Sequence, residues 1–413
     1  MLARARQHSG ALYLFVTTMV ANVLAYGYQV VMARLLRPEE YAVLTALFGI
    51  LVLESISSQV IQSATAKLTA QYRARDEEAA LHAFVRRWAV RVGGGGAALG
   101  LVVVVLSGAI AAALELPALS VALLGVTLFL ALVFTFGVGL LQGLARFMWM
   151  GTALIAQAGS RLAVGVALVV LGFGVDGAFT GATAAIAISL LVLAVPLLPL
   201  FRAARGSTVQ HELGPAETRF FALSAVILLA YAALTNIDAV LARSLLRPED
   251  AGAYAGAITM GKIVLFAPIA IGFLLLERTA RAHALGEDTD RALYLALAFV
   301  LATSGLVAGA YIVLPEFIVP IVVGSQYPET AKIVGTYGVA ALANALLSLW
   351  IAYFIGRGEM RVGLLLAVAV VAEVALLLTT ATDPLAMARI VLFVALATQT
   401  AAVATFIVLR RRG

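Results

Sequence analysis

The sequence Leu35-Leu36-Arg37-Pro38-Glu39 recurs, residue for residue, as Leu245-Leu246-Arg247-Pro248-Glu249, which lies 210 positions further along a chain of 413 residues. Both copies close a long apolar run, both are followed by a second acidic residue, and the next apolar run begins within a few positions. A repeat at half the chain length indicates two homologous halves. The polar connection 202–218 separates them, so we expect an N-terminal lobe over 1–205 and a C-terminal lobe over 206–413.

The composition places the chain in the membrane. Hydrophobic residues make up 63% of the sequence and charged residues 12%, with a mean hydropathy of +1.03. A soluble domain carries about a quarter charged residues, so we expect an all-α polytopic membrane protein. The net charge of +6 would suggest nucleic acid for a soluble chain. In a membrane protein it is expected of the cytoplasmic loops, and we predict no nucleic-acid partner.

Twelve apolar runs are long enough to cross a bilayer as helices. They fall at residues 11–36, 40–66, 84–111, 118–142, 148–172, 177–201, 219–244, 251–276, 292–314, 329–355, 362–381 and 385–409. Six runs lie on each side of the connection 202–218, so both halves share one orientation. Two such six-helix lobes are related by a pseudo-two-fold axis along the membrane normal, and the transport site is expected between them.

The distribution of arginine and lysine predicts the orientation. With both termini in the cytoplasm, 20 of the 28 basic residues lie inside and 6 outside. Because cytoplasmic loops carry the excess of positive charge, we predict a multi-pass protein of the bacterial cytoplasmic (inner) membrane with both termini inside.

Signatures of catalysis and metal binding are missing from the sequence. There is no cysteine, and the four histidines have no metal-ligand spacing. No Walker-type glycine loop and no GxSxG element occurs. We therefore expect no enzyme activity, no metal and no cofactor. Any driving force would be a proton or sodium gradient or the membrane potential.

Polar residues recur at helical spacing within the expected spans. In the first span Thr18, Asn22, Tyr26 and Gln29 share one face. Similar rows occur in the second, fifth, seventh and tenth spans, with these members: Glu54, Ser58 and Gln62; Ser55, Gln59 and Ser63; Gln157 and Arg161; Tyr231, Thr235 and Asp238; Asn344 and Ser348. A charge at mid-bilayer costs about 2.5–3.5 kcal/mol on insertion scales, so such residues face a bundle interior or a wet cavity.

The repeat places opposite charges at nearly equivalent depths. Subtracting 210 from Lys262 gives position 52, two residues from Glu54. One interpretation is a hydrated, partly cationic cavity between the lobes, which we favour because the serines and glutamines beside Glu54 need water or ligand. The other is an ion pair of Glu54 with Lys262 or Arg161 that only fastens the lobes together. Glu373 lies in an otherwise apolar helix, and we expect it to be structural or protonated.

These features resemble a known family. Twelve spans in a six-plus-six duplication, a first helix ending in Ala33-Arg34-Leu35-Leu36-Arg37-Pro38-Glu39-Glu40-Tyr41, and a seventh containing Asn236-Ile237-Asp238 are similar to the oligosaccharide (Wzx-like) flippases. Those flippases belong to the multidrug/oligosaccharidyl-lipid/polysaccharide (MOP) exporter superfamily, as do the MATE transporters. The resemblance covers essentially the whole chain. It implies two six-helix lobes around a basic cavity, working by alternating access.

The resemblance also implies a substrate, a polyprenyl-diphosphate-linked oligosaccharide moved to the external leaflet for surface-polysaccharide synthesis. The diphosphate needs cations at depth, which Arg161 and Lys262 would supply. The sugars need hydroxyl and amide partners, which we assign to these residues: Asn22, Tyr26, Gln29, Gln59, Gln62 and Asn344. Coupling or gating is assigned to Glu54, Asp238 and Arg34. The expected partners are the lipid-linked oligosaccharide, membrane lipids and polysaccharide polymerase or assembly proteins, with the transporter itself monomeric.

Two alternatives remain open. A MATE-like, ion-coupled antiporter of drugs or organic cations would need a cavity dominated by acids and aromatics, and the buried Arg161 and Lys262 argue against it. A membrane glycan polymerase or ligase acts on the same lipid-linked substrates. Such an enzyme needs a sizeable external loop or an acidic motif, whereas the expected external loops are short.

Overall fold

The structure is a computed structural model that describes residues 2–204, 215–265, 275, 279, 290–359 and 361–410. Within these ranges the regular structure is helical, and no strand is present among them. Ten helices of the described ranges are long and apolar enough to cross a membrane. The all-α polytopic class expected from composition is therefore confirmed.

The difference between these ten helices and the twelve expected spans has two causes. The helical stretch Phe147–Ala204 is counted as one but contains two passes, α6 and α7, which reverse direction at Gly172, where φ is +93°. The eighth expected span corresponds to α10 (Pro248–Val264), and its remainder lies outside the described residues. The kink that the sequence suggests at Pro268 falls there too.

Packing divides the chain into two compact units. Unit 1 comprises Met1–Leu36 and Glu54–Thr218, and unit 2 comprises Arg37–Leu53 and Arg219–Gly413. The division into homologous halves at 205/206 stays a prediction from the repeat, since these units are defined by contacts and not by ancestry. One consequence is specific to α2 (Pro38–Ala74): its first turns pack with unit 2 and its remainder with unit 1.

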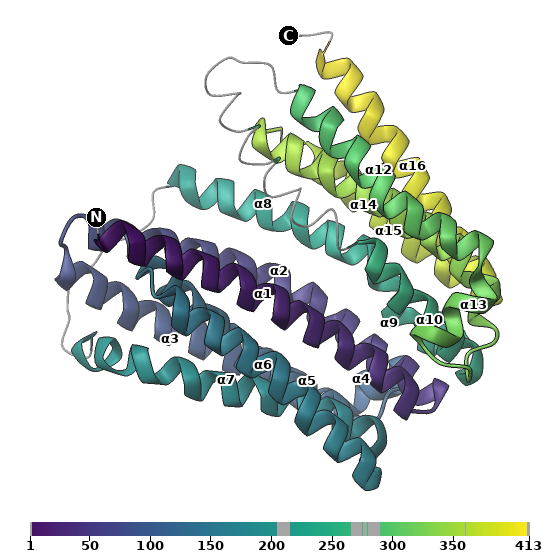
Figure 1. The fold of residues 1–413 in the computed structure, drawn as a ribbon, viewed down its shortest axis with the longest axis horizontal. Coiled ribbons are helices and arrows are strands. Elements are labelled where there is room, and N and C mark those ends of the chain that lie inside the picture. Colours follow the sequence, from purple (N-terminus) through teal and green to yellow (C-terminus); the bar gives the residue numbers. More distant parts are fainter. Residues whose placement is uncertain are drawn as a thin grey trace. The chain divides into compact units, whose positions relative to one another are not determined.

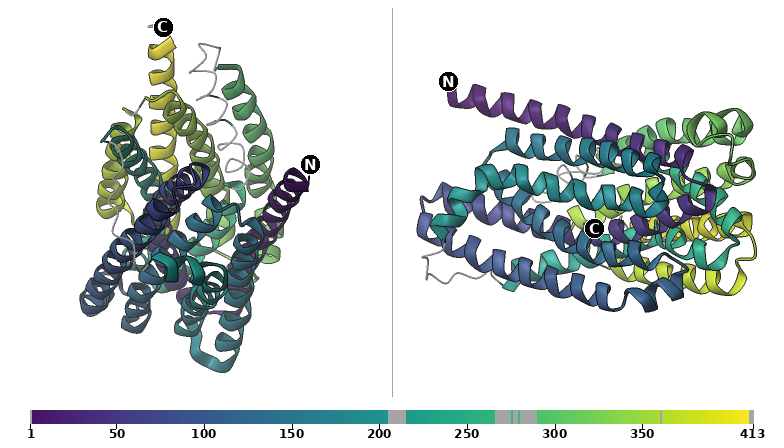
Figure 2. Two further views of the ribbon diagram at one scale, coloured as in Figure 1. Left: turned by 90° about the vertical axis from the view of Figure 1, so that its left-hand side faces the viewer. Right: turned by 90° about the horizontal axis from the view of Figure 1, so that it is seen from below.

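Unit 1 is a bundle of long helices that run roughly along one direction (Figures 1 and 2). In it α1 packs on α6, α6 on α7, and α5 on both α3 and α7. Its helices besides α2 are α1 (Leu2–Leu35), α3 (Glu78–Val105), α4 (Ser107–Leu114), α5 (Ala118–Gly143), α6 (Phe147–Leu168) and α7 (Gly174–Ala204), with a π-helical turn η1 (Val169–Phe173) between the last two.

Unit 2 centres on α14, which packs against α10, α12 and α16 (Figure 1). Its remaining helices are α8 (Pro215–Leu234), α9 (Ile237–Leu245), α12 (Asp290–Val313), α13 (Pro315–Val322), α14 (Thr330–Gly356), α15 (Val362–Thr380) and α16 (Pro384–Arg410). Its core is aromatic, with Trp350, Tyr353 and Phe354 of α14 meeting Phe406 of α16.

The repeated motif is a helix start in both places. Pro38 and Pro248 are the first residues of α2 and α10, where a missing N–H and a preset φ cost nothing. The Arg37 N–H donates to the Glu40 carboxylate at 3.1 Å, as in a capping box, and Arg247 pairs with Asp250 at 2.8 Å. Acidic residues in the first turn also complement the helix dipole.

The two helix starts meet inside unit 2. A side chain added at Gly252 would place its Cβ 2.5 Å from Pro38, so the absence of a side chain lets α10 approach α2 closely. Further along, the Tyr41 hydroxyl lies 2.5 Å from that of Thr259, and Tyr41 packs edge-on against Tyr327 with ring centroids 6.1 Å apart. The repeat is therefore used twice, as a start signal and as a contact surface.

Glycine fixes the contact of α3 with α5 in unit 1. A Cβ on Gly125 would lie 2.5 Å from the Gly100 carbonyl oxygen, and a Cβ on Gly100 would lie 2.6 Å from that of Gly125. Small residues let membrane helices pack backbone to backbone. The neighbouring Gly95 has open space around it, so the run Gly93–Gly96 is only partly used for packing.

We expect Gly125→Val to destabilise unit 1 severely, by about 3 kcal/mol, because the added side chain meets backbone that cannot yield. Gly95→Val is the matched control, since the same side chain there meets open space. Thermal unfolding of the two purified variants in one detergent measures the difference. Equal melting temperatures would show that the close approach of α3 to α5 is wrong.

Candidate functional site

Unit 2 contains a break in the helix that the sequence predicts as continuous over 219–244. Helix α8 ends at Leu234, and α9 begins at Ile237. The Asn236 side chain donates to the Ala232 carbonyl at 3.0 Å and the Thr235 hydroxyl to that of Tyr231 at 3.0 Å. Such side chains compete with the backbone ladder and interrupt it. Backbone left irregular at membrane depth is tolerated where it is buried in protein or lines a site.

Asp238 lies in the first turn of α9, directly after this break. Its side chain is buried, with 1% of the residue exposed. The hydroxyls of Tyr254 and Tyr337 donate to its Oδ2 at 2.9 and 3.0 Å, and the two rings meet edge to face at 5.5 Å. Its other oxygen, Oδ1, has no hydrogen-bond donor within the described ranges. One oxygen of this buried carboxyl group thus accepts no hydrogen bond from the described residues.

A second buried acid belongs to the same site. Glu373 of α15 is 1% exposed, and neither of its carboxyl oxygens has a hydrogen-bond partner in the part of the chain that the structure describes. The two carboxyl groups interact electrostatically, and Lys262 of α10 attracts Asp238. Two carboxylates in so apolar a place cannot both be charged without a compensating cation. The arrangement can therefore take up a proton or a small monovalent cation.

The described residues hold no group of three or more His, Cys, Asp or Glu side chains that would form a metal centre. The acid pair is supplemented by phenol and ammonium groups instead. The carboxyl groups can take up a proton, and carboxyl and phenol oxygens suit a hard cation, with which the Lys262 ammonium would compete.

Unit 1 contains a half-buried arginine that lies against an aromatic ring. The Arg161 guanidinium of α6 lies over the ring of Tyr28 of α1, 5.2 Å from the ring centroid. Tyr28 is fully buried, and its hydroxyl donates to the Ala178 carbonyl at 2.8 Å. Gly165 leaves room for the ring, since a Cβ there would lie 2.7 Å from it. The ring is held from two sides, so it fixes where the guanidinium lies.

The polar rows of α1 and α2 are partly accessible. Asn22 and Gln59 are exposed, while Tyr26, Gln29 and Gln62 are half-buried. The Gln62 amide donates to the Gln142 carbonyl oxygen of α5 at 3.0 Å. Ser58 donates to Glu54 at 2.5 Å, as the four-residue spacing predicts.

The remaining predicted residues have less specific surroundings. Asn344 is buried, its backbone carbonyl accepts from the Tyr231 hydroxyl at 2.9 Å, and its side-chain oxygen has no donor among the described residues. Arg34 is exposed in the last turn of α1. Glu54 belongs to unit 1 and Lys262 to unit 2, so their pairing stays a prediction.

Sequence reasoning missed several participants. Tyr28, Tyr337 and Gln142 lie in apolar stretches and contact their partners over 80 or more positions of sequence. Glu373 was noted, but nothing in the sequence joins it to Asp238. The one available signal was a buried charge on an apolar helix, which demands a partner somewhere in the fold.

The comparisons with known proteins bear on this geometry. No family model matches the chain. Uncharacterized proteins of Mycobacterium tuberculosis and Mycobacterium bovis are each 26% identical to it over 243 residues, which cover 56% of this chain and 53% of each relative. The match thus spans about half the length of these relatives.

Solved structures match over almost the whole chain. A multidrug resistance MATE family transporter of the MOP superfamily matches with a TM-score of 0.75 at 12% identity, covering 97% of this chain and 99% of that one. The fold of this chain is therefore similar to that of this transporter. The lipid II flippase MurJ follows with a TM-score of 0.68 at 11% identity (96% and 87% covered), and a eukaryotic MATE transporter with 0.66 at 14% (98% and 96%).

The likeness to these structures confirms the predicted twelve-helix, two-lobe class. The structures themselves are those of transporters and of a lipid flippase. At identities this low the likeness establishes the fold alone. Substrate has to be argued from the side chains of this chain.

Proposed function

We propose that this protein is a flippase that moves a polyprenyl-diphosphate-linked oligosaccharide from the cytoplasmic to the external leaflet. It works without a cofactor and is driven by a proton or sodium gradient or the membrane potential. The protein is proposed to be a monomer in a bacterial inner membrane, with both termini cytoplasmic, serving polysaccharide polymerase or assembly proteins.

The observation that carries this proposal is Arg161. The half-buried Arg161 guanidinium lies over the fully buried ring of Tyr28, and arginine is the side chain best suited to phosphate. Its planar fork of donors suits phosphate oxygens, which it can bind two at a time. An organic-cation exporter gains nothing from such a group, whereas a lipid diphosphate requires one.

The amides of α1 and α2 supply what sugars need. Asn22, Gln29, Gln59 and Gln62 offer both donors and acceptors on two helices of unit 1, and each is at least partly accessible. Sugar hydroxyls are recognised by paired donor and acceptor groups of this kind. These four amides lie in the same unit as Arg161, whereas Lys262 and Asn344, which the sequence also assigns to the substrate, lie in unit 2.

The buried acids of unit 2 favour ion coupling, which is also the property that a MATE-like antiporter would need. Asp238 accepts from two tyrosine hydroxyls, Glu373 is equally buried, and Lys262 attracts Asp238. We assign the exchange of a proton or sodium ion to this group. The antiporter is accordingly the second candidate. The two candidates share this coupling site and differ in what Arg161 binds.

Reconstituted protein separates the candidates. Proteoliposomes receive a fluorescent polyprenyl-diphosphate disaccharide, and a membrane-impermeant quencher reports how much reaches each leaflet. We expect the protein to raise transbilayer movement of this lipid at least tenfold over empty liposomes and to leave a fluorescent organic cation in place. Cation export without lipid movement would establish the antiporter and end the flippase proposal.

A further inference from the structure

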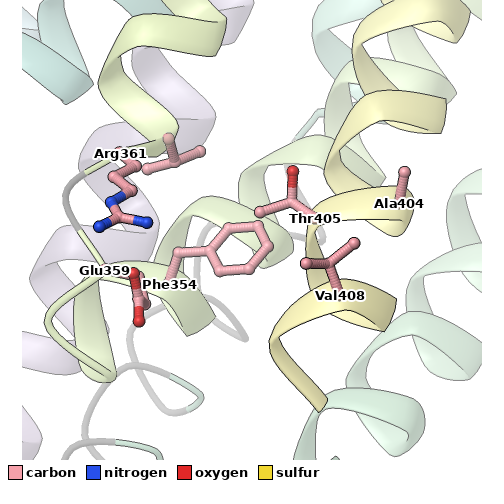
Figure 3. A pocket seen from close by; sticks show the side chains of 7 residues that line it. Phe354, Glu359, Arg361, Ala404, Thr405 and Val408 are labelled. Atoms are coloured by element: carbon pink, nitrogen blue, oxygen red, sulfur yellow. The ribbon is translucent and has the colours of Figure 1, made fainter. Parts of the chain in front are cut away.

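A cavity of about 280 Å³ lies in unit 2 at the connection between α14 and α15, where α16 passes (Figure 3). Phe354 of α14, Val362 of α15 and Val408 of α16 make it apolar inside. Two opposite charges, Glu359 and Arg361, stand together at its edge (Figure 3). Neither the coupling acids nor Arg161 belongs to it.

The helix end fixes where the acid lies. Gly358 has a φ of +75°, the Gly358 N–H donates to Ile355 at 3.0 Å and the Glu359 N–H to Phe354 at 2.8 Å. This is a Schellman motif, which closes α14 and turns the chain sharply. Arg361 follows as the N-cap residue of α15 and makes no side-chain cap hydrogen bond. Glu359 therefore lies at the closed end of α14, and Arg361 lies at the start of α15.

The two charges are available for a ligand. Within the described ranges no ion pair joins Glu359 to Arg361, although they are two positions apart. The neighbouring Arg357 is already engaged, since it donates to the Tyr353 hydroxyl at 2.9 Å, and that hydroxyl donates to Asp290 at 2.7 Å. Arg361 is thus the cation that remains at the cavity edge.

The surface beside the cavity belongs in hydrocarbon. Leu364 and Val368 of α15 are 73% and 60% exposed, and Ile407 of α16 is 45% exposed. In a protein with membrane-spanning helices, such faces contact lipid chains. A ligand of this cavity therefore has an apolar chain that continues along α15 and α16, and a head that carries both a negative and a positive charge.

We propose that this cavity binds phosphatidylethanolamine, a phospholipid whose head joins a phosphate to a primary ammonium. Arg361 takes the phosphate as a charge-assisted donor, Glu359 accepts from the ammonium, and one acyl chain enters the apolar interior. The opposite charges exclude a purely anionic lipid, which would meet Glu359. A trimethylated head has no N–H to donate, so it loses the contact with Glu359.

A second cavity, which lies in unit 1, differs from this one because it carries no charge. It measures about 320 Å³, lies between α3, α5 and α7, and is lined only by apolar side chains and glycine. Any hydrocarbon chain fits it without regard to the head. Of the two cavities, only the one bordered by Glu359 and Arg361 can therefore select a lipid by its head group.

The test is lipid binding to the delipidated, purified protein, followed by native mass spectrometry with phosphatidylethanolamine, phosphatidylcholine and phosphatidylglycerol of identical chains. We expect phosphatidylethanolamine to bind about tenfold more tightly than the other two, the effect of one charge-assisted hydrogen bond. Glu359→Gln should reduce it to the level of phosphatidylcholine. Arg361→Gln should weaken phosphatidylethanolamine and phosphatidylcholine alike.

The matched controls are Glu329→Gln and Lys332→Gln, an exposed pair 2.8 Å apart at the opposite end of α14. They should leave all three affinities unchanged. Ala404→Phe, which fills the cavity without touching a charge, should remove the preference among head groups. Equal binding of the three lipids by the wild type, tighter binding of phosphatidylglycerol, or equal losses in the controls would each overturn the proposal.

Discussion

Replacing Asp238 with asparagine is expected to abolish gradient-driven transport while the protein still folds. Asparagine keeps an oxygen that can accept from the Tyr254 and Tyr337 hydroxyls, so the packing of the site survives. It removes the negative charge to which a proton or cation binds. We expect the dependence of flux on the gradient to fall by about 100-fold, near the upper end of coupling between ligand sites.

The measurement compares flux in proteoliposomes with and without an imposed proton or sodium gradient. Thermal stability is recorded in parallel, because an ion that binds only the folded protein raises the melting temperature. Wild type should be stabilised by the coupling ion at constant ionic strength, and Asp238→Asn should not. Glu373→Gln should act in the same direction.

Asp176→Asn is the control for the loss of a carboxylate. Asp176 accepts from Ser120 at 2.5 Å in unit 1, so the change again preserves an acceptor. Its flux should keep the dependence of the wild type. If Asp238→Asn and Asp176→Asn both behave as wild type, the buried acids of unit 2 are structural, and coupling has to be sought elsewhere, with Glu54 as the next candidate.

The fold class follows from the length and apolar composition of segments that can be identified in the sequence alone. Apolar runs of bilayer length are a local property, and they predicted the helical membrane class correctly. The duplication inferred from the repeat stays a prediction. The four-residue rows were similarly reliable, as the contact of Ser58 with Glu54 shows. Periodicity along one helix needs no knowledge of its neighbours.

What could not be predicted depends on contacts between helices. The break at Thr235 and Asn236 depends on side chains that bond to the backbone in preference to continuing the ladder, and neither residue forbids a helix by itself. The assignment of Arg37–Leu53 to unit 2 depends on Gly252 meeting Pro38. The sequence shows that a glycine permits close packing, but the helix that packs against it is known only from the folded structure.

The candidate site shows the same limit. Arg161 and Asp238 are prominent in the sequence because a charge within an apolar run is costly, and that signal is local to one helix. Their partners Tyr28 and Tyr337 are amphipathic residues that serve equally well in any apolar core. The sequence therefore identifies groups that demand a partner and leaves the partner to the fold.

The largest effect on substrate binding is expected at Arg161. Arg161→Ala should weaken binding of a polyprenyl-diphosphate sugar by about 10- to 100-fold, since hydrogen bonds from a charged donor contribute about 1.5–3 kcal/mol. Arg161→Lys should recover only part of the loss, because an ammonium replaces the planar fork with a point charge. Binding to purified protein, checked for equal folding, is the measurement.

Two further variants separate a binding role from a structural one. Tyr28→Phe keeps the ring under the guanidinium and removes the hydrogen bond to Ala178, so it should cost about 1 kcal/mol of stability and leave the affinity intact. Arg146→Ala removes an exposed arginine at the start of the same helix, whose guanidinium donates to Pro196 at 2.6 Å. It should also leave affinity unchanged.

These variants decide between the two transporter candidates. A group that only fastens helices together loses stability when it is truncated, and the loss appears in the melting temperature whatever the ligand. A group that binds diphosphate loses affinity at unchanged stability, and the loss is larger for alanine than for lysine. Equal affinity of wild type, Arg161→Ala and Arg161→Lys would remove the diphosphate from this site, and the acids of unit 2 would then favour export of organic cations.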